Sequence, residues 1–350
     1  MNLKELSAHL GLSQTTVSRA LNGYPEVSEA TRQRVAAAAE QHNYRPNTRA
    51  KGLATGRAMA VGHVIPASAR HEMVNPIFGD FISGAGETYA THGYDMVLSM
   101  VDDGDQARVY RELKAKGTVD GLIIHGPAVA DERIGLIREL GLPFVVHGRA
   151  TAETEPYSWV DVNNKSAFQR ATELLVDLGH RRIALLNGLE TMDFARRRRA
   201  GFEAAHEARG LDVNLSLMLS EEMTETYGHQ RAHEMLDRDD GPTAFIVSSM
   251  IIAMGVRRAL EERGLAIGRD VSVITHDDDL SYLRNGGEVP LFTATRSSVR
   301  EAGRISAQML IDQITMPTDE IPTRLLEAPL MLGRSTGPYP STDAHADAAQ

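Results

Sequence analysis

The sequence contains no cysteine. This absence excludes disulfide frameworks, thiolate metal sites and cysteine nucleophiles, and it agrees with a reducing compartment. Long apolar segments are also missing, because no window holds the roughly 18 uncharged apolar residues of a membrane helix. The opening MNLKELSAHLGLSQ lacks the apolar stretch of a signal peptide. We therefore expect a cytoplasmic protein with no membrane partner.

Motifs that support catalysis are lacking as well. No glycine-rich phosphate loop follows an expected strand, and no Gly-x-Ser-x-Gly elbow occurs. His229 and His233 stand four residues apart on an expected helix, which resembles half of a zinc site, but no third ligand accompanies them. A solvated helix face explains this pair better. We expect a chain that is not an enzyme and that carries no cofactor and no metal.

The length of the chain and the distribution of its charge indicate several folding units. Its 350 residues, 42% of them hydrophobic, can form two or three folding units. The net charge of −10 is unevenly distributed: the first 57 residues hold eight Lys and Arg and four Asp and Glu, whereas the remainder holds 29 against 43. A basic N-terminal segment before an acidic body suits nucleic-acid contact through the N-terminus.

Helix signals divide the basic segment into three short helices. We expect them over residues 3–10, 14–21 and 29–41. Asn2 and Glu5 form a capping box for the first helix. Gly11 then turns the chain and Ser13 caps the second helix, so the pair forms a helix-turn-helix unit. The apolar seam that closes this small core comprises Leu6, Leu10, Val17, Leu21, Val35, Ala36 and Ala39.

Polar side chains of the second helix lie outside this seam and near the start of the helix. They are Gln14, Thr15, Ser18 and Arg19. Arg can bond guanine and Gln can bond adenine in bidentate fashion, so these residue types suit a helix that reads bases in the major groove. The alternative is a helical pair used only for packing or dimerisation. The helix caps, the turn at Gly11 and the apolar seam all agree with a helix-turn-helix unit, which favours DNA binding.

From Met59 onward, apolar runs alternate with amphipathic stretches. The runs are AVGHVIP, YDMVLS, VDGLIIH, LPFVVHG, RIALLNG, TAFIVSS and VSVITH. Such runs separated by helical patterns indicate βαβ units and parallel sheets, and seven of them suit two doubly wound lobes. Ligands of these folds bind at the carboxyl ends of strands, so we expect a cleft between the lobes. The expected fold class is an all-α headpiece followed by a two-lobed α/β core.

Four consecutive arginines, residues 196–199, are candidates for this cleft. Such a run is usually a solvated face or a nucleic-acid patch. Helical spacings of three and four place only Arg198 on the face of Phe194 and Phe202, so Arg198 points inward. An effector contact and a structural salt bridge both remain open for it.

An acidic run, residues 277–279, follows the apolar run VSVITH. The carboxylate of Asp277, just past the expected strand, can accept hydrogen bonds from two sugar hydroxyls. The alternatives are a helix cap, which suits Asp278 or Asp279, and a metal cluster, which no ligand set at fixed spacing supports. Trp159, the only tryptophan, lies at the expected first crossover between lobes; it can stack on a sugar ring or fill the core.

The stretch TTVSRALNGYPEVSEATRQRVAAAAEQHNYRPNTRAKGLATGR resembles the headpiece of the lactose/galactose repressor (LacI/GalR) family almost position by position. The resemblance implies a DNA-binding headpiece over residues 1–45 in which Gln14, Thr15 and Arg19 read bases. The other DNA contacts that it implies are Thr16, Ser18, Asn22, Tyr44 and Asn47. Residues 46–58 match a hinge helix that orders on DNA, with Leu53 wedged into the minor groove. A flexible basic linker is the alternative.

The resemblance extends over the core, through NPIFGDFISGAGETYATHGYD, LGHRRIALLNG, ARRRRAGFEAA and VSVITHDDDL. It implies the fold of periplasmic binding proteins over residues 59–334. The implied lobes are residues 60–161 with 291–318, and residues 162–290 with 319–334. Arg198 and Asp277 match effector contacts. Several positions depart from the family pattern: Ser249 and Met250 replace a common Asn-Asp pair, Thr275 and His276 replace a common Gly-aromatic pair, and Ser297 replaces a Gln.

The resemblance also implies a function. It predicts a homodimeric repressor whose affinity for operator DNA is controlled by a small molecule, by default a sugar, and the opening most resembles regulators of α-glucoside utilisation. An activator, or a corepressor-dependent regulator with a non-sugar effector, is the alternative. A sugar transport protein would need an export signal and an enzyme would need a catalytic base. Residues 335–350 lack a leucine heptad and are expected to be a disordered tail.

Overall fold

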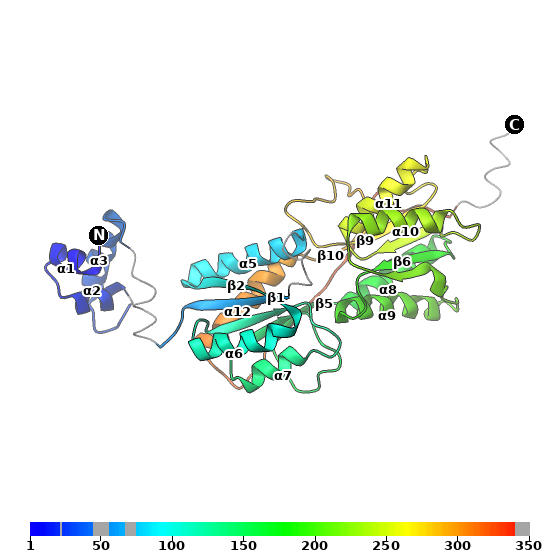
Figure 1. Ribbon diagram of the computed structural model, residues 1–350. Coiled ribbons are helices and arrows are strands. Elements are labelled where there is room, and N and C mark those ends of the chain that lie inside the picture. Colours follow the sequence, from blue (N-terminus) through cyan, green and yellow to red (C-terminus); the bar gives the residue numbers. More distant parts are fainter. Residues whose placement is uncertain (22, 45–55, 67–74, 340–350) are drawn as a thin grey trace.

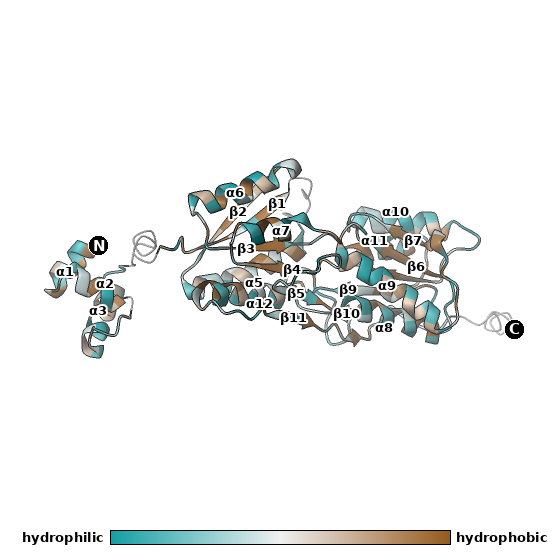
Figure 2. Cartoon of the chain, turned by 90° about the horizontal axis from the view of Figure 1, so that it is seen from below, coloured by the Kyte–Doolittle hydropathy of each residue, from teal (hydrophilic) through white to brown (hydrophobic). Residues whose placement is uncertain are grey.

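The computed structural model describes residues 1–21, 23–44, 56–66 and 75–339. Figure 1 shows a small helical headpiece and two larger α/β lobes, which confirms the expected fold class. Within these residues, no helix has both the length and the apolar character needed to cross a membrane. Figure 2 shows apolar strands in the interior of each lobe, with helices that are polar on their outer faces.

The headpiece is built from three helices. They are α1 (Leu3–Leu10), α2 (Gln14–Leu21) and α3 (Glu29–Gln41). Asn2 and Glu5 form the predicted capping box, and Gly11 ends α1 in the left-handed conformation with φ 64°. Leu6, Val17 and Val35 are fully buried at the centre. One seam prediction is wrong: Ala36 is exposed and Ala38 is buried in its place. Spacings of three and four put Ala38 and Ala39 on the same face of α3 as Val35, and Ala36 lies outside that face.

The first lobe is a six-stranded sheet in the order β11-β5-β4-β3-β1-β2, with all strand pairs parallel. Its strands are β1 (Ala60–Pro66), β2 (Asp95–Val101), β3 (Gly121–His125), β4 (Phe144–His147), β5 (Trp159–Val162) and β11 (Thr323–Leu326). Helices cover both faces: α5 (Pro76–His92) and α12 (Val299–Thr315) on one, α6 (Gln106–Lys116) and α7 (Glu132–Glu139) on the other.

The second lobe repeats this plan, with the strand order β12-β10-β9-β8-β6-β7. Its strands are β6 (Ile183–Asn187), β7 (Met218–Ser220), β8 (Ala244–Val247), β9 (Ser272–Asp277), β10 (Thr293–Arg296) and the antiparallel β12 (Leu330–Met331). One face carries α8 (Asn164–Asp177) and α9 (Asp193–Ala208), and the other carries α10 (Glu225–Leu236) and α11 (Met250–Glu262). Short 3-10 helices also lie at Asp103–Asp105 and Leu215–Leu217.

The predicted lobe boundaries need correction in the C-terminal part. The prediction assigned residues 291–318 to the first lobe, but β10 pairs with β9 in the second. It assigned residues 319–334 to the second lobe, but β11 pairs with β5 in the first. The sequences TATR and TRLL are too short and too polar to stand out as apolar runs, so only their pairing reveals their lobe. The chain therefore crosses between lobes after β5, after β10 and after β11.

The start of the predicted disordered tail is packed against the second lobe. Ser335 is fully buried, and its hydroxyl accepts a hydrogen bond of 2.8 Å from the Thr293 amide. The Ser335 carbonyl accepts from the Val273 amide at 2.7 Å, and the Tyr339 amide donates to the Leu178 carbonyl at 2.9 Å. The prediction is thus wrong for residues 335–339, because Ser335 bonds to the backbone of two strands and Tyr339 bonds to the end of α8. Residues 340–350 lie outside the described residues.

Candidate functional site

The helix α2 presents polar side chains on one face of the headpiece. The Ser13 hydroxyl accepts a hydrogen bond of 3.0 Å from the Thr16 amide and so begins the helix. Gln14, Thr15 and Arg19 are exposed, whereas Thr16 and Ser18 are half-buried beside the core. The three side chains expected to read bases are therefore accessible to a ligand as large as duplex DNA.

The remaining residues expected at DNA lie at the end of the headpiece and in the hinge. Tyr44 is half-buried against the headpiece core, and burial raises the pKa of its phenol. Asn22, Asn47 and Leu53 lie outside the described residues, as does most of the 46–58 hinge. Beyond the hinge, the Asp120 carboxylate accepts hydrogen bonds of 2.7 Å from both the Ala58 and the Met59 amides. The first lobe thus holds the chain firmly where the hinge segment ends.

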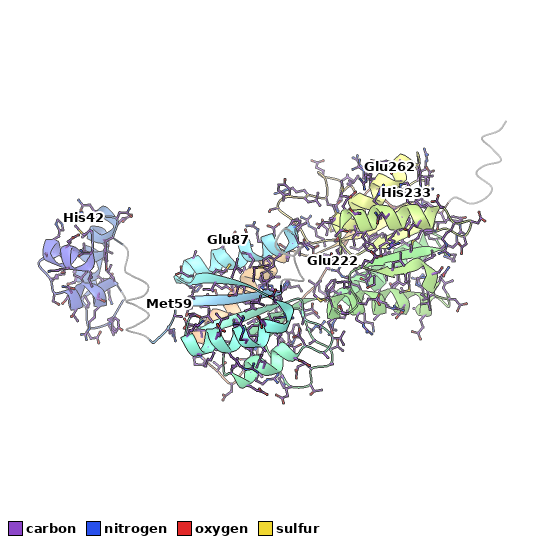
Figure 3. All side chains as sticks on the ribbon, viewed as in Figure 1. His42, Met59, Glu87, Glu222, His233 and Glu262 are labelled. Atoms are coloured by element: carbon purple, nitrogen blue, oxygen red, sulfur yellow. The ribbon has the colours of Figure 1, made fainter. Side chains whose placement is uncertain are left out.

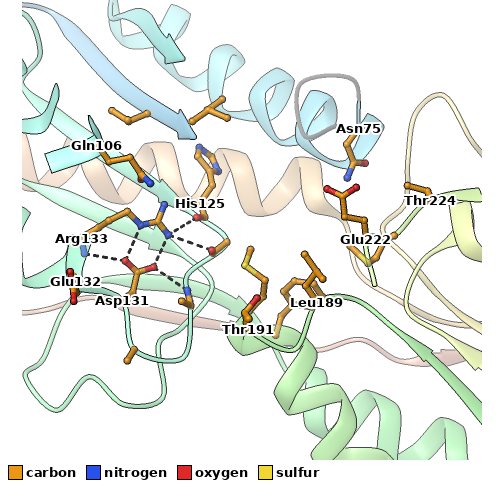
Figure 4. Close-up of a pocket in the computed structure, with 18 residues that line it drawn as sticks. Asn75, Gln106, His125, Asp131, Glu132, Arg133, Leu189, Thr191, Glu222 and Thr224 are labelled. Atoms are coloured by element: carbon orange, nitrogen blue, oxygen red, sulfur yellow. Dashed lines mark hydrogen bonds and ion pairs between the residues drawn. The ribbon is translucent and has the colours of Figure 1, made fainter. Parts of the chain in front are cut away.

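A cleft lies between the two lobes at the carboxyl ends of their strands, and it has two chambers. The inner chamber, of about 180 Å³, is lined from both lobes. The outer chamber, of about 710 Å³, opens toward Gln106, Arg133 and Glu222 (Figure 4). Residues that line both chambers form the passage between them: Asn75, His125, Gly126, Met192, Phe194 and Met223. The two chambers therefore adjoin each other.

Arg198 lies in the wall of the inner chamber, as its helical position predicted. Its side chain is only 5% exposed. Its Nε donates to the Asn164 side chain at 2.8 Å and its Nη1 donates to the Ser248 carbonyl at 2.5 Å. The guanidinium carbon lies 5.0 Å from the Phe194 ring centre. Burial lowers the pKa of Arg198 to about 10, so the guanidinium remains charged at neutral pH.

Of the two neighbouring aspartates, Asp278 lines the cleft and the predicted Asp277 does not. Asp278 lines the inner chamber together with His276. Asp277 ends β9 on the opposite side of the strand, where it accepts a 2.9 Å hydrogen bond from the Asp279 amide. Side chains alternate along a strand, so residues 276 and 278 share the face that 277 does not. Burial raises the pKa of Asp278 to about 7, while the Arg198 charge acts in the opposite direction.

Two other predicted effector residues also lie away from the inner chamber. Ser249 caps α11, with its hydroxyl accepting from the Ile252 amide at 3.3 Å, and its neighbour Ser248 lines the chamber instead. Trp159 packs in the apolar cluster of the first lobe, under the Arg149 guanidinium at 4.7 Å. From the same strand, Asp161 reaches the chamber. The aromatic side chain that does line both chambers is Phe194.

The wall that the first lobe contributes was not predicted from the sequence. It consists of Phe78, Phe81, His125 and His147. The rings of Phe81 and His147 stack at 4.3 Å, and burial lowers the pKa of His147 to about 4, so this histidine is neutral. The available signal was a histidine at the end of each apolar run, in LIIH and FVVH. Since parallel strands end at one edge, those histidines had to meet there.

The lobes also bond directly to each other beside the outer chamber. We call this contact the clasp; it joins Pro127 and Thr151 of the first lobe to Asp193 and Arg197 of the second. The Thr151 amide donates to the Asp193 carboxylate at 2.7 Å, and its hydroxyl donates to the same oxygen. The Asp193 amide donates to the Pro127 carbonyl at 3.0 Å, and Arg197 donates to the Thr151 hydroxyl at 3.0 Å. Separation of the lobes would break every one of these bonds.

Comparison with known proteins agrees with this architecture. Residues 2–47 match the family described as bacterial regulatory proteins, lacI family, and residues 58–332 match that of periplasmic binding proteins and the sugar binding domain of the LacI family. The chain is 43% identical over 341 residues to the HTH-type transcriptional regulator AglR of Rhizobium meliloti (strain 1021), covering 97% of this chain and 95% of that one.

Two solved structures extend the similarity to the fold. The complex of transcriptional regulator CelR with cellobiose has a TM-score of 0.71 at 29% identity and covers 95% of this chain and 99% of its own. The lac repressor dimer bound to operator and the anti-inducer ONPF has a TM-score of 0.77 at 26% identity, over 96% and 99% of the two chains. The present chain therefore belongs to the LacI family of bacterial regulatory proteins and is a DNA-binding transcription regulator.

Proposed function

We propose that this regulator represses a sugar uptake and catabolism operon and that a carbohydrate bound between its lobes controls its affinity for DNA. The observation that carries this proposal is the inner chamber, where Arg198 and Asp278 face an aromatic wall. A guanidinium donates to sugar oxygens and a carboxylate accepts from hydroxyls, while aromatic rings pack against the apolar side of a sugar ring. The chamber suits binding rather than catalysis.

The size of the cleft favours an effector of more than one sugar ring. The inner chamber, at about 180 Å³, is smaller than the roughly 300–1,000 Å³ of typical ligand sites, whereas the outer chamber, at about 710 Å³, lies within that range. A disaccharide can fill the inner chamber with one ring and extend past Phe194 with the next. Together with the resemblance of the N-terminal segment, this favours an α-glucoside such as maltose, sucrose or trehalose.

On the DNA side, we propose that a homodimer places its two α2 helices in successive major grooves of a near-palindromic operator. Gln14, Thr15 and Arg19 would read bases, as their exposure allows. Contacts to phosphates are proposed for Thr16, Ser18, Asn22, Tyr44 and Asn47, and Leu53 of a hinge helix would enter the minor groove. The lac repressor structure, a dimer on its operator, supports this arrangement by analogy.

The mechanism we propose is a linked equilibrium between effector and DNA. An effector that contacts both walls of the cleft favours the closed arrangement, in which the clasp is formed. Closure changes the orientation of the first lobe, which carries the Asp120 contact to the end of the hinge segment. The separation of the two hinges in the dimer would change, and operator affinity would fall with it.

The test is fluorescence anisotropy with a palindromic operator from upstream of a sugar operon, at two salt concentrations, with a panel of α-glucosides. Tight, salt-dependent binding that one α-glucoside abolishes is the expected result. Binding that every sugar leaves unchanged would refute the sugar effector. Binding that a ligand strengthens would refute relief of repression and establish a corepressor. Arg19→Ala should cost about 1–3 kcal/mol and relax operator specificity, which checks the headpiece separately.

A further inference from the structure

Three metal-ligating side chains converge on the face of the second lobe that carries α10 and α11. His229 and His233 come from α10, and Glu262 comes from the end of α11. The Nε2 atoms of both histidines lie 2.8 Å from the same oxygen of Glu262. One ligand atom from each residue lies within 4.8 Å of the other two. Figure 3 labels His233 and Glu262 where the two helices meet.

The third member of this cluster is what the sequence did not reveal. A spacing of four residues places the two histidines on one helix face, but a third ligand was missing from their surroundings in the sequence. Glu262 lies 29 residues beyond His233, and the packing of α11 against α10 brings it there. The carboxylate completes a set of two imidazole nitrogens and one oxygen, which is a known ligand combination for zinc.

Backbone packing, and not only flexible side chains, fixes the relative position of these ligands. Gly228 and Gly255 let the two helices touch at the level of His229. A Cβ atom on Gly228 would lie 2.3 Å from the Ile252 carbonyl oxygen, and one on Gly255 would lie 2.0 Å from that of Glu225. The backbones of the two helices are therefore in direct contact at this level, and this close packing holds the three side chains near one another.

We propose that His229, His233 and Glu262 form a binding site for a late first-row divalent cation, which joins α10 to α11 with solvent completing the coordination. Zn²⁺ binds imidazole nitrogen at about 2.0–2.1 Å and carboxylate oxygen at about 2.0–2.2 Å. An ion between the three atoms needs only a small outward movement of side chains that are half-buried or exposed. Cu²⁺ and Ni²⁺ suit the same donors, because affinity at nitrogen and oxygen sites rises toward the end of the series.

Arg263 acts against this site and provides a sharp test of it. Its Nε donates to His233 Nδ1 at 3.1 Å, and its Nη2 donates to the Asp237 carboxylate at 2.5 Å. Because Nδ1 accepts that bond, the ring proton is on Nε2, the atom that must bind the ion. When the ion binds, the proton moves to Nδ1 and Arg263 Nε must turn away. Removal of Arg263 should therefore increase metal affinity.

The experiment is calorimetric titration of chelator-treated full-length protein with ZnCl₂. We expect one ion per protomer in the wild type and a higher melting temperature with zinc. Loss of outer-sphere partners of a metal commonly costs about 10–100-fold in affinity, so Glu262→Gln and His233→Ala should each cost at least about tenfold. Glu261→Gln is the matched control, since Glu261 pairs with Arg257 and should leave affinity unchanged. Arg263→Ala should bind zinc more tightly than the wild type.

A second pair of histidines requires its own control. In the headpiece, His9 Nε2 lies 3.3 Å from His42 Nε2, so His9→Ala should leave zinc binding intact. Visible absorption of bound Co²⁺ measures metal binding to the wild-type protein without any substitution. Added zinc should displace the Co²⁺ and abolish this absorption. Zinc binding that is absent in the wild type, or unchanged in Glu262→Gln, would overturn the proposal. Binding lost in His9→Ala but retained in His233→Ala would also overturn it.

Discussion

The first lobe and the second lobe face the same cleft with different chemistry. The first contributes aromatic rings and neutral histidines, among them Phe78 and His147, together with the carboxyl group of Asp161. The second contributes a buried guanidinium and a carboxyl group, Arg198 and Asp278. Polar contacts fix the orientation of a ligand, whereas apolar contacts gain mainly from excluding water. Among the described residues that line the inner chamber, the one guanidinium comes from the second lobe, so we expect that lobe to fix the orientation of the proposed effector.

The largest expected effect is on the second-lobe wall. Arg198→Ala should reduce effector affinity by about 100-fold, since each hydrogen bond to a charged group contributes about 1.5–3 kcal/mol. Operator binding without effector should be unchanged. Titration calorimetry with the effector identified by anisotropy measures the first quantity. Arg196→Ala is the matched control, because Arg196 is exposed on the same helix. Equal losses in both variants would contradict the assigned role of Arg198.

A second prediction concerns Asp278 and pH. Its folded pKa of about 7 lies above the unfolded value of about 4. Between these values the folded state holds a proton that the unfolded state has lost, so stability falls as pH rises from about 4 to about 7. Asp278→Asn should therefore gain on the order of 3 kcal/mol relative to wild type between the two ends of this window. Urea unfolding at several pH values checks this, and a variant whose profile parallels the wild type would refute it.

The first lobe should show the opposite sign. His63 is fully buried beneath the aromatic wall and bonds His125 at 2.8 Å, and burial lowers its pKa to about 3. Below about pH 6.5, His63 is protonated in the unfolded state but stays neutral in the folded state. The free energy of unfolding therefore falls as pH falls toward about 3. His63→Gln should lose less stability than wild type on acidification in the same unfolding series. If the free energy of unfolding changed with pH in the same way in His63→Gln and in the wild type, the expected difference between the lobes would be wrong.

A smaller effect is expected at the clasp, which belongs to both lobes. Thr151→Val keeps the side-chain shape but removes the hydroxyl that bonds Asp193 and Arg197. A net hydrogen bond contributes about 1 kcal/mol, so effector affinity should fall about fivefold as the closed state becomes less favourable. The anisotropy midpoint for effector-induced release should shift by the same factor. An unchanged midpoint would show that closure does not depend on the clasp.

The smallest effect is expected on the first-lobe wall. Phe78→Leu retains an apolar side chain but loses the edge contact with His125, whose ring centre is 5.2 Å away. Such aromatic contacts contribute about 0.5–1.5 kcal/mol, and because Leu keeps part of the contact we expect a loss of about 0.5–1 kcal/mol, which is about two- to fivefold in effector affinity. Calorimetry with the same effector measures this directly. A loss as large as that of Arg198→Ala would remove the proposed difference between the two walls.

The sequence predicted best what depends on neighbouring residues. The capping box of Asn2 and Glu5 and the turn at Gly11 are complete within a few positions, so the headpiece helices were predicted residue by residue. The inward position of Arg198 followed from helical spacing alone. The strands of both lobes were recognised wherever the apolar run was long enough. Local chemistry and helical periodicity suffice for such features.

What the sequence did not predict depends on partners far along the chain. Asp277 and Asp278 exchange roles because β9 continues one residue further than expected, and strand pairing decides where it ends. Ser335 looked like part of a flexible tail because its partners, the backbones of Val273 and Thr293, are more than 40 residues away. Glu262 was missed for the same reason. In each of these three cases, the position of a short polar segment depends on a contact with residues far along the chain.

The interleaved lobes have a consequence for synthesis of the protein. The first lobe lacks α12 and β11 until residue 326 has been made, and the second lobe lacks β12 until residue 331. The headpiece is complete at its third helix, which ends at Gln41. Since domains fold as they leave the ribosome, each molecule completes its helix-turn-helix headpiece long before either lobe is complete. A nascent or truncated chain would therefore carry the headpiece without the means to regulate it.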